Sequence, residues 1–332
     1  MSKKHSSIVV RPFIFLSKWR SLPPFEMASY VLMYASIPML AYGIHPYNLD
    51  IIKLIILTIL TMYSGFFAAL IWNDITDKDI DTVVHPDRPI PSGKISSKKF
   101  FAVALLFSAM TFIFSILVSF WCFIVVICAA LFVSIHDKYL KKIVNFPAYS
   151  EIFTPVQWVV VAIFGFLAIW TALPPNGEVL LTVSVFGNIS FDWYDLQNMI
   201  LLVLFTYFAD NAHDLPEGIH DTDGDRKLGV KTYATSFGEK NAARISFVMF
   251  LISGILGIVI YLRTALGFIF LIPFVCIWIY TLFYSFKLLK ANDNEINELS
   301  AVVGRKGFNY FIFTYDFIFI DILVQLVLLN FK

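Results

Sequence analysis

Long runs of apolar residues constrain the fold of this chain more than any other feature of its sequence. They cover about residues 27–44, 51–72, 100–118, 120–136, 152–172, 197–212, 243–262, 265–286 and 308–330. A transmembrane helix needs roughly 20 such residues, and the run 100–136 fits two spans divided near Ser119. The pattern predicts an all-α, polytopic membrane protein with about nine transmembrane helices.

Composition supports this class and excludes others. Of the 332 residues, 58% are hydrophobic and 15% are charged, whereas a soluble domain carries nearer one quarter charged residues. The net charge of +1 argues against a nucleic-acid partner, because such proteins present a basic face. Three cysteines, all within apolar runs, form neither a disulfide framework nor a zinc site.

The distribution of cations predicts an orientation. If nine helices alternate, only Lys53, Arg263 and Lys332 of the 25 Lys and Arg residues fall outside the loops of one side. Cytoplasmic loops are enriched in Lys and Arg, so we expect a cytoplasmic N-terminus in a bacterial or archaeal inner membrane. We find no internal repeat and no low-complexity linker. The expected organisation is a cytoplasmic N-terminal segment, 1–26, and one transmembrane domain, 27–332.

The second apolar run ends in an acidic cluster, residues 73–81. If the helix continues, Asn73, Asp77 and Asp81 are four residues apart and share one face, with Asp74 beside them. An acidic residue here lies at the membrane surface, at the end of a span.

The sixth apolar run ends in a second cluster on the same expected side. It comprises Asp210, Asp214, Glu217, Asp221, Asp223 and Asp225. Asp214, Asp221 and Asp225 are seven and then four residues apart, again one helical stripe. Pro216 lies within that stripe, and we expect it to kink the helix where the freed carbonyl faces a cavity.

Two such clusters in helical register favour a common site over two solvated loops. Carboxylates at this density repel one another, and a hard divalent cation relieves the repulsion. Mg²⁺ prefers oxygen ligands and typically bridges one or two carboxylates to substrate phosphates. The sequence therefore indicates a Mg²⁺–diphosphate site.

Candidate diphosphate ligands follow the clusters or lie on the same expected side. Arg88 stands between turn-forming prolines after the first cluster, where its guanidinium can bind phosphate oxygens, and Lys94 can add charge. Tyr139 and Lys141 follow the fourth span. Each of these residues also fits a purely interfacial role, because Lys, Arg and Tyr are frequent at membrane surfaces.

These motifs resemble the UbiA superfamily of intramembrane prenyltransferases. The family's Asn-Asp-x-x-Asp-x-x-x-Asp motif is matched by Asn73, Asp74, Asp77 and Asp81, followed by Arg-Pro-Ile-Pro-Ser-Gly at 88–93. Its second motif is matched by Asp214, Asp221, Asp225, Gly229 and Thr232, and Tyr139-Leu-Lys-Lys142 resembles its segment after the fourth helix. The likeness covers about residues 25–330.

The resemblance implies helices around a central cavity, capped by cytoplasmic helical loops. It implies Mg²⁺-dependent transfer of a geranylgeranyl- or farnesyl-class chain from its diphosphate to an aromatic, quinone-precursor-like acceptor or another lipophilic acceptor. The Mg²⁺ ligands would be Asn73, Asp77, Asp81, Asp221 and Asp225. The expected catalytic residues are Asp74, Asp77, Asp214 and Asp221, and the expected diphosphate ligands are Arg88, Lys94, Tyr139 and Lys141.

Two alternatives stay open. Glu217 stands where many family members carry Tyr or Lys, so a UbiA-type terpene cyclase is the first alternative. In such an enzyme the allylic cation attacks a double bond of its own chain. An ion-coupled transporter is the second alternative, because acids inside a membrane mark ion pathways. Against it, the acids cluster at span ends, and none lies in the middle of a span before Asp316 and Asp321 in the last one.

Overall fold

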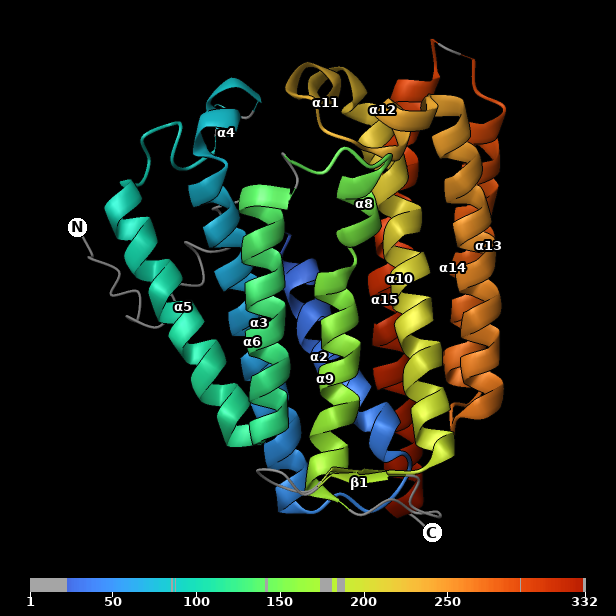
Figure 1. The fold of residues 1–332 in the computed structure, drawn as a ribbon. Coiled ribbons are helices and arrows are strands. Elements are labelled where there is room, and N and C mark those ends of the chain that lie inside the picture. Colours follow the sequence, from blue (N-terminus) through green and yellow to red (C-terminus); the bar gives the residue numbers. More distant parts are fainter. Residues whose placement is uncertain are drawn as a thin grey trace, which may run out of the picture.

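The computed structural model describes residues 23–84, 86, 88–140, 143–173, 181–183, 189–292 and 294–330, and these form a bundle of long helices (Figure 1). Lys141 and most of the expected N-terminal segment lie outside the described residues. The long helices are α2 (Pro24–Tyr42), α3 (Leu49–Thr76), α5 (Ser97–Val118), α6 (Phe120–Ile135), α9 (Val156–Ala172), α10 (Trp193–His220), α13 (Glu239–Arg263), α14 (Phe268–Leu289) and α15 (Ile296–Asn330).

Short elements join the long helices at both ends of the bundle. At the end that carries the two acidic clusters lie α4 (Lys78–Val84), α8 (Tyr149–Phe153), α11 (Thr222–Leu228), α12 (Tyr233–Phe237) and a π-helical turn, η1 (His136–Leu140). At the opposite end, β1 (Leu181–Val183) pairs antiparallel with β2 (Ile189–Phe191), with Leu181 opposite Phe191.

Seven helical segments among the described residues are long and apolar enough to cross a membrane, which confirms a polytopic membrane protein. Helices α2 and α10 run beside them (Figure 1) but fall outside that set, so the count of nine stays a prediction. The division near Ser119 is correct. Ser119 has an extended backbone, and its hydroxyl accepts a hydrogen bond from Cys122 N, so it begins α6 as an N-cap.

The core lies around α2, α9, α10 and α15. More than half of the span that includes α9 is buried, whereas less than a quarter of each span that includes α5, α6 or α14 is buried, as expected for helices that face lipid. Gly165 of α9 lies against α2, where a Cβ atom would come within 2.3 Å of Ile37. Helix α10 packs between α9, α13 and α15, and its last turns carry the second acidic cluster.

Asp321 has a structural explanation. Its two carboxylate oxygens accept hydrogen bonds from Gly267 N (2.8 Å) and Phe270 N (3.1 Å) at the start of α14. The first amides of a helix lack a carbonyl four residues earlier, and Phe270 N has only a three-residue contact to Gly267 O (3.2 Å) besides Asp321, so Asp321 caps α14 from the neighbouring helix. An acid within the last span is therefore a helix cap rather than a step in an ion pathway.

Candidate active site

The first acidic cluster is a joint between two helices. Helix α3 ends at Thr76, Asp77 adopts φ −93° and ψ 8°, and α4 begins at Lys78. The helical hydrogen bonds continue across the joint, from Asp77 N to Asn73 O (2.9 Å) and from Asp81 N to Asp77 O (2.8 Å). Asn73 Nδ2 also donates to Asp77 Oδ2 at 2.8 Å. The helix is thus interrupted, contrary to simple continuation, but the four-residue spacing is preserved.

The second acidic cluster repeats this geometry. Helix α10 ends at His220, Asp221 adopts φ −94° and ψ 4°, and the seven-residue helix α11 follows. Asp221 N donates to Glu217 O (3.1 Å), and Asp225 N donates to Asp221 O (3.0 Å). Gly229 then ends α11 at φ 71°, a left-handed conformation that favours glycine. Each acidic motif is therefore a 28-residue helix, an aspartate joint and a seven-residue helix.

Both joints lie at the same end of the bundle, where Figure 1 shows α4 and α11. In the described part of the chain, however, the acidic and histidine side chains close enough to share one ion are those of Asp210, His213 and Asp214. The five predicted Mg²⁺ ligands belong to two separate joints rather than to one preformed group. Their role stays a prediction.

Arg88 is bound to the first joint. Its Nη1 lies 2.6 Å from Asp81 Oδ1 and 3.9 Å from Asp74 Oδ1. Asp74 and Asp81 are almost completely buried, so the guanidinium compensates two carboxylates that water does not reach. Lys94 is exposed after the same loop, and Tyr139 is half-exposed on η1.

A cavity of about 530 Å³ opens beside the second joint. Its lining includes the aromatic side chains of Tyr30, Trp158 and Phe308 and the single guanidinium of Arg305. The other charged or ionisable residues of the lining are Glu26, Asp210, His213, Asp214, Glu217, His220 and Asp221. Five carboxylates thus face one guanidinium and two imidazoles, which makes the cavity acidic with aromatic walls.

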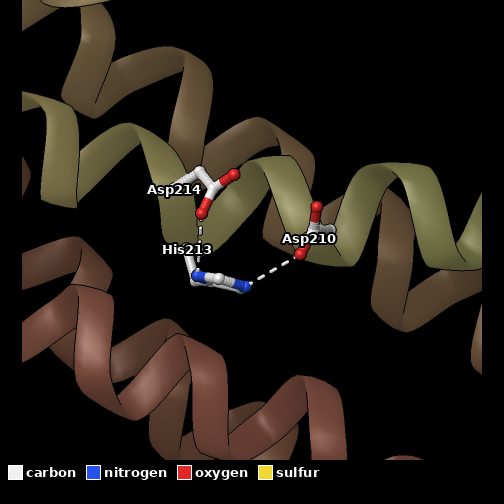
Figure 2. Close-up of side chains that lie close together, drawn as sticks. All are labelled: Asp210, His213 and Asp214. Carbon is white, nitrogen blue, oxygen red and sulfur yellow. Dashed lines mark hydrogen bonds and ion pairs between the residues drawn. The ribbon is translucent and has the colours of Figure 1, made fainter. Parts of the chain in front are cut away.

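His213 was not among the residues that the sequence singled out. Its imidazole lies between two carboxylates (Figure 2), with Nε2 3.1 Å from Asp210 Oδ1 and Nδ1 3.4 Å from Asp214 Oδ1. The available signal was a histidine three residues after one acid and beside another, at the end of an apolar run. A lone histidine is ordinarily a packing residue, so only the fold reveals its surroundings.

The structure corrects the expected surroundings of the carbonyl that Pro216 frees, whereas the kink stays a prediction. Helix α10 includes Pro216 and ends at His220. A proline deprives the carbonyl four residues earlier of its helical partner, which here is Ala212 O. That oxygen accepts a hydrogen bond from Ser246 Oγ of α13 at 2.7 Å instead of facing a cavity.

The tail of the second motif is fastened to α8. Tyr233 N, at the start of α12, donates to a carboxylate oxygen of the buried Glu151. Ser150 N donates to Lys231 O (3.1 Å), and Ala148 N donates to Ser236 Oγ (2.9 Å). A Cβ atom on Gly218 would collide with Glu151 Oε1, so the glycine leaves room for this carboxylate beside α10.

The carboxylates of the second joint influence one another. Partial burial and, to a smaller extent, the neighbouring charge of Asp221 together raise the pKa of Asp225 to about 6. A bound cation would reverse this effect, because it favours the ionised carboxylate.

The sequence is similar to proteins of one known family. Residues 30–308 match the profile of the UbiA prenyltransferase family. Digeranylgeranylglyceryl phosphate synthase of Saccharolobus solfataricus is 28% identical over 181 residues, 53% of this chain and 54% of that protein. The enzyme of the same name from Methanococcus aeolicus is 25% identical over 292 residues, 86% of each chain. The match spans only about half the length of the first curated relatives.

Solved structures show the same fold. An apo UbiA homologue from Aeropyrum pernix K1 superposes with a TM-score of 0.65 at 18% identity, covering 91% of this chain and 99% of that one. A UbiA homologue from Archaeoglobus fulgidus bound to GPP and Mg²⁺ superposes with a TM-score of 0.52 at 18% identity, covering 86% and 96%. Because the family profile covers most of the sequence and the bundle matches these homologues, the chain belongs to the UbiA prenyltransferase family.

Proposed function

We propose that this protein transfers a prenyl chain from a prenyl diphosphate to a lipophilic acceptor, with release of diphosphate and in the presence of Mg²⁺. The observation that carries the proposal is the pair of equivalent aspartate joints at one end of the bundle, next to a cavity with aromatic walls. The donor is of the geranylgeranyl or farnesyl class. The relatives' names support a geranylgeranyl chain, and the DMAPP and GPP bound by the Archaeoglobus homologue support a prenyl diphosphate as donor.

The donor atoms of the two joints fit Mg²⁺. Asn73, Asp77, Asp81, Asp221 and Asp225 offer only oxygen atoms as ligands, which this ion prefers. Among the described residues, Asp81 Oδ2 is buried and has no hydrogen-bond partner, as expected for a ligand atom. When bound, Mg²⁺ would neutralise the negative charge that develops on the departing diphosphate.

The chain's own residues have distinct roles in this proposal. Asp74 and Asp81 hold the Arg88 guanidinium at the first joint, where its remaining N–H groups can bind diphosphate oxygens. Lys94, Tyr139 and Lys141 would complete the diphosphate site. Asp77, Asp214 and Asp221 would act at the reacting end. The aromatic walls of the cavity would exclude water and stabilise an allylic cation.

The proposal also specifies the chemical class of the acceptor. The names of the relatives specify a glyceryl phosphate product with two geranylgeranyl groups, which favours an acceptor hydroxyl on a glyceryl lipid over an aromatic ring. We place the site on the cytoplasmic face, as the Lys and Arg distribution indicates.

The test uses purified protein in detergent with Mg²⁺ and labelled geranylgeranyl diphosphate, with and without geranylgeranylglyceryl phosphate. Diphosphate release and a lipid product are measured together. Asp77→Ala removes a joint residue, and Asp79→Ala is the matched control, because Asp79 is an exposed acid of α4 outside the stripe.

Product formed only with acceptor, lost in Asp77→Ala and kept in Asp79→Ala, supports the proposal. Cyclic hydrocarbon formed without acceptor would make the protein a cyclase instead. If geranylgeranyl diphosphate does not bind with or without Mg²⁺, both the transferase and the cyclase assignments are wrong, and the transporter alternative is favoured.

A further inference from the structure

The imidazole of His213 is hydrogen-bonded on one side and faces a carboxylate without a hydrogen bond on the other. Asp210 Oδ1 binds Nε2, and the rings of Phe308 and Phe311 lie 5.3 and 5.9 Å from the imidazole ring. Nδ1 is buried and has no hydrogen-bond partner in the described part of the chain, and Asp214 Oδ1 lies 3.4 Å from it. A buried ring nitrogen this close to a carboxylate oxygen needs either a proton or a cation between the two atoms.

The groups nearest to Nδ1 are carboxylate oxygens. Asp214 Oδ1 lies 3.4 Å away, and Glu217 Oε1 lies 4.0 Å away. Two ligand atoms on a tetrahedral ion with bonds of about 2.1 Å are separated by about 3.4 Å. The first distance already has this value. Glu217 is half-exposed, and its Oε1 would have to move closer to Nδ1 on binding to complete the site.

Asp210 completes the arrangement from the far side of the ring. A metal-binding histidine almost always donates its other N–H to a carboxylate or carbonyl, which fixes the tautomer and directs the free nitrogen at the ion. The contact between Asp210 Oδ1 and His213 Nε2 has this geometry (Figure 2).

Helix α15 is shaped to fit these side chains. A Cβ atom on Gly307 would lie 2.7 Å from His213 Cβ, and one on Gly304 would lie 2.6 Å from Glu217 Cγ. Both glycines therefore allow α15 to pack directly over this face of α10.

We propose that His213, Asp214 and Glu217 bind a divalent transition metal of the zinc type, with Asp210 as the carboxylate that orients the imidazole. Mixed nitrogen and oxygen ligands suit such an ion, whereas Mg²⁺ prefers oxygen alone. Three protein ligands leave a fourth position, which faces the cavity and can take a water or hydroxyl oxygen. The site lies in the same cavity as the second joint and shares Asp214 with the residues proposed to act at the reacting end, but it uses neither Asp77 nor Asp221, and its occupancy can be measured without prenyl transfer.

The test is a titration of the full-length, chelator-treated protein in detergent with Co²⁺, with millimolar Mg²⁺ present to occupy oxygen-only sites. Visible absorption reports tetrahedral Co²⁺, and elemental analysis gives the stoichiometry. We expect one Co²⁺ per chain. We expect His213→Ala to abolish the absorption, and Asp210→Asn to weaken binding by about 10- to 100-fold.

His220→Ala is the matched control, because His220 is on the same helix and lines the same cavity but binds Asn297. It should bind Co²⁺ as the wild type does, and so should Asp221→Ala. Glu217→Gln tests the site if His213→Ala does not fold, since Glu217 is half-exposed, and it should weaken binding at least 10-fold. No Co²⁺ on the wild type, or unchanged binding by His213→Ala or by Glu217→Gln, would overturn the proposal. Prenyl transfer assayed on the same samples decides the proposed function separately.

Discussion

Glu151 holds the tail of the second motif, and its removal has a predictable cost. The carboxylate is buried and accepts the N–H of Tyr233, which is itself buried at the start of α12. Glu151→Ala leaves this N–H without its partner where water does not replace it. A buried donor left without its partner lowers the free energy of unfolding by about 1–3 kcal/mol.

The loss should be visible as a lower thermal transition of the purified protein in detergent. At about 2 °C per kcal/mol for a chain of this size, we expect a decrease of about 2–6 °C. Glu151→Gln keeps an acceptor oxygen at the same place, so its transition temperature should decrease by less than half as much as that of Glu151→Ala. The effect stays limited because two other hydrogen bonds, from Ser150 N and Ala148 N, still join α8 to the tail.

Tryptophan fluorescence during heating measures the transition, and Glu298→Ala serves as the control because Glu298 is an exposed acid of α15. An alanine variant that unfolds within 1 °C of the wild type would refute the argument that this hydrogen bond matters. A glutamine variant as unstable as the alanine variant would refute the assignment of the effect to an accepted hydrogen bond.

Two further predictions concern Ser246 and Arg88. Ser246→Ala removes the hydroxyl that donates to Ala212 O, so it should lower the free energy of unfolding by about 1 kcal/mol. Ser246→Thr keeps a hydroxyl and should retain most of the wild-type stability. Equal losses in both variants, measured by thermal unfolding, would contradict this role. Arg88→Ala leaves the buried Asp81 without its 2.6 Å partner and should lower the thermal transition by several degrees. Millimolar Mg²⁺ should restore part of this loss. If Mg²⁺ leaves the transition temperature of the variant unchanged, Asp81 lies outside the proposed metal site.

The sequence was sufficient for the features that arise within one segment. Apolar length located the spans, and the serine at 119 divided two of them because its side chain caps the second. The four-residue spacing of the acids survived the joints at Asp77 and Asp221, because hydrogen bonds between residues four apart run through both.

Features that depend on contacts between distant helices could not be predicted. Asp321 caps a helix that begins 54 residues earlier, and Glu151 binds an amide 82 residues later. No local pattern distinguishes such an acid from one in an ion pathway or a loop. The surroundings of His213 could not be predicted either, because the cavity and α15 form them rather than its neighbours in the chain.

The two joints share a concentration of acids that needs an explanation. Helices α3 and α10 end at this face, at Thr76 and His220. The carbonyls at the joints are not left unpaired, because Asp77 O accepts from Asp81 N and Asp221 O accepts from Asp225 N. The mutual repulsion of the carboxylates is what opposes each joint, and positive charge relieves it. Arg88 supplies some of it at the first joint. At the second, Arg226 lies on the exposed side of α11, 3.9 Å from the exposed Asp223. The proposed binding of Mg²⁺ with diphosphate thus accounts for a placement of acids that stability alone would disfavour.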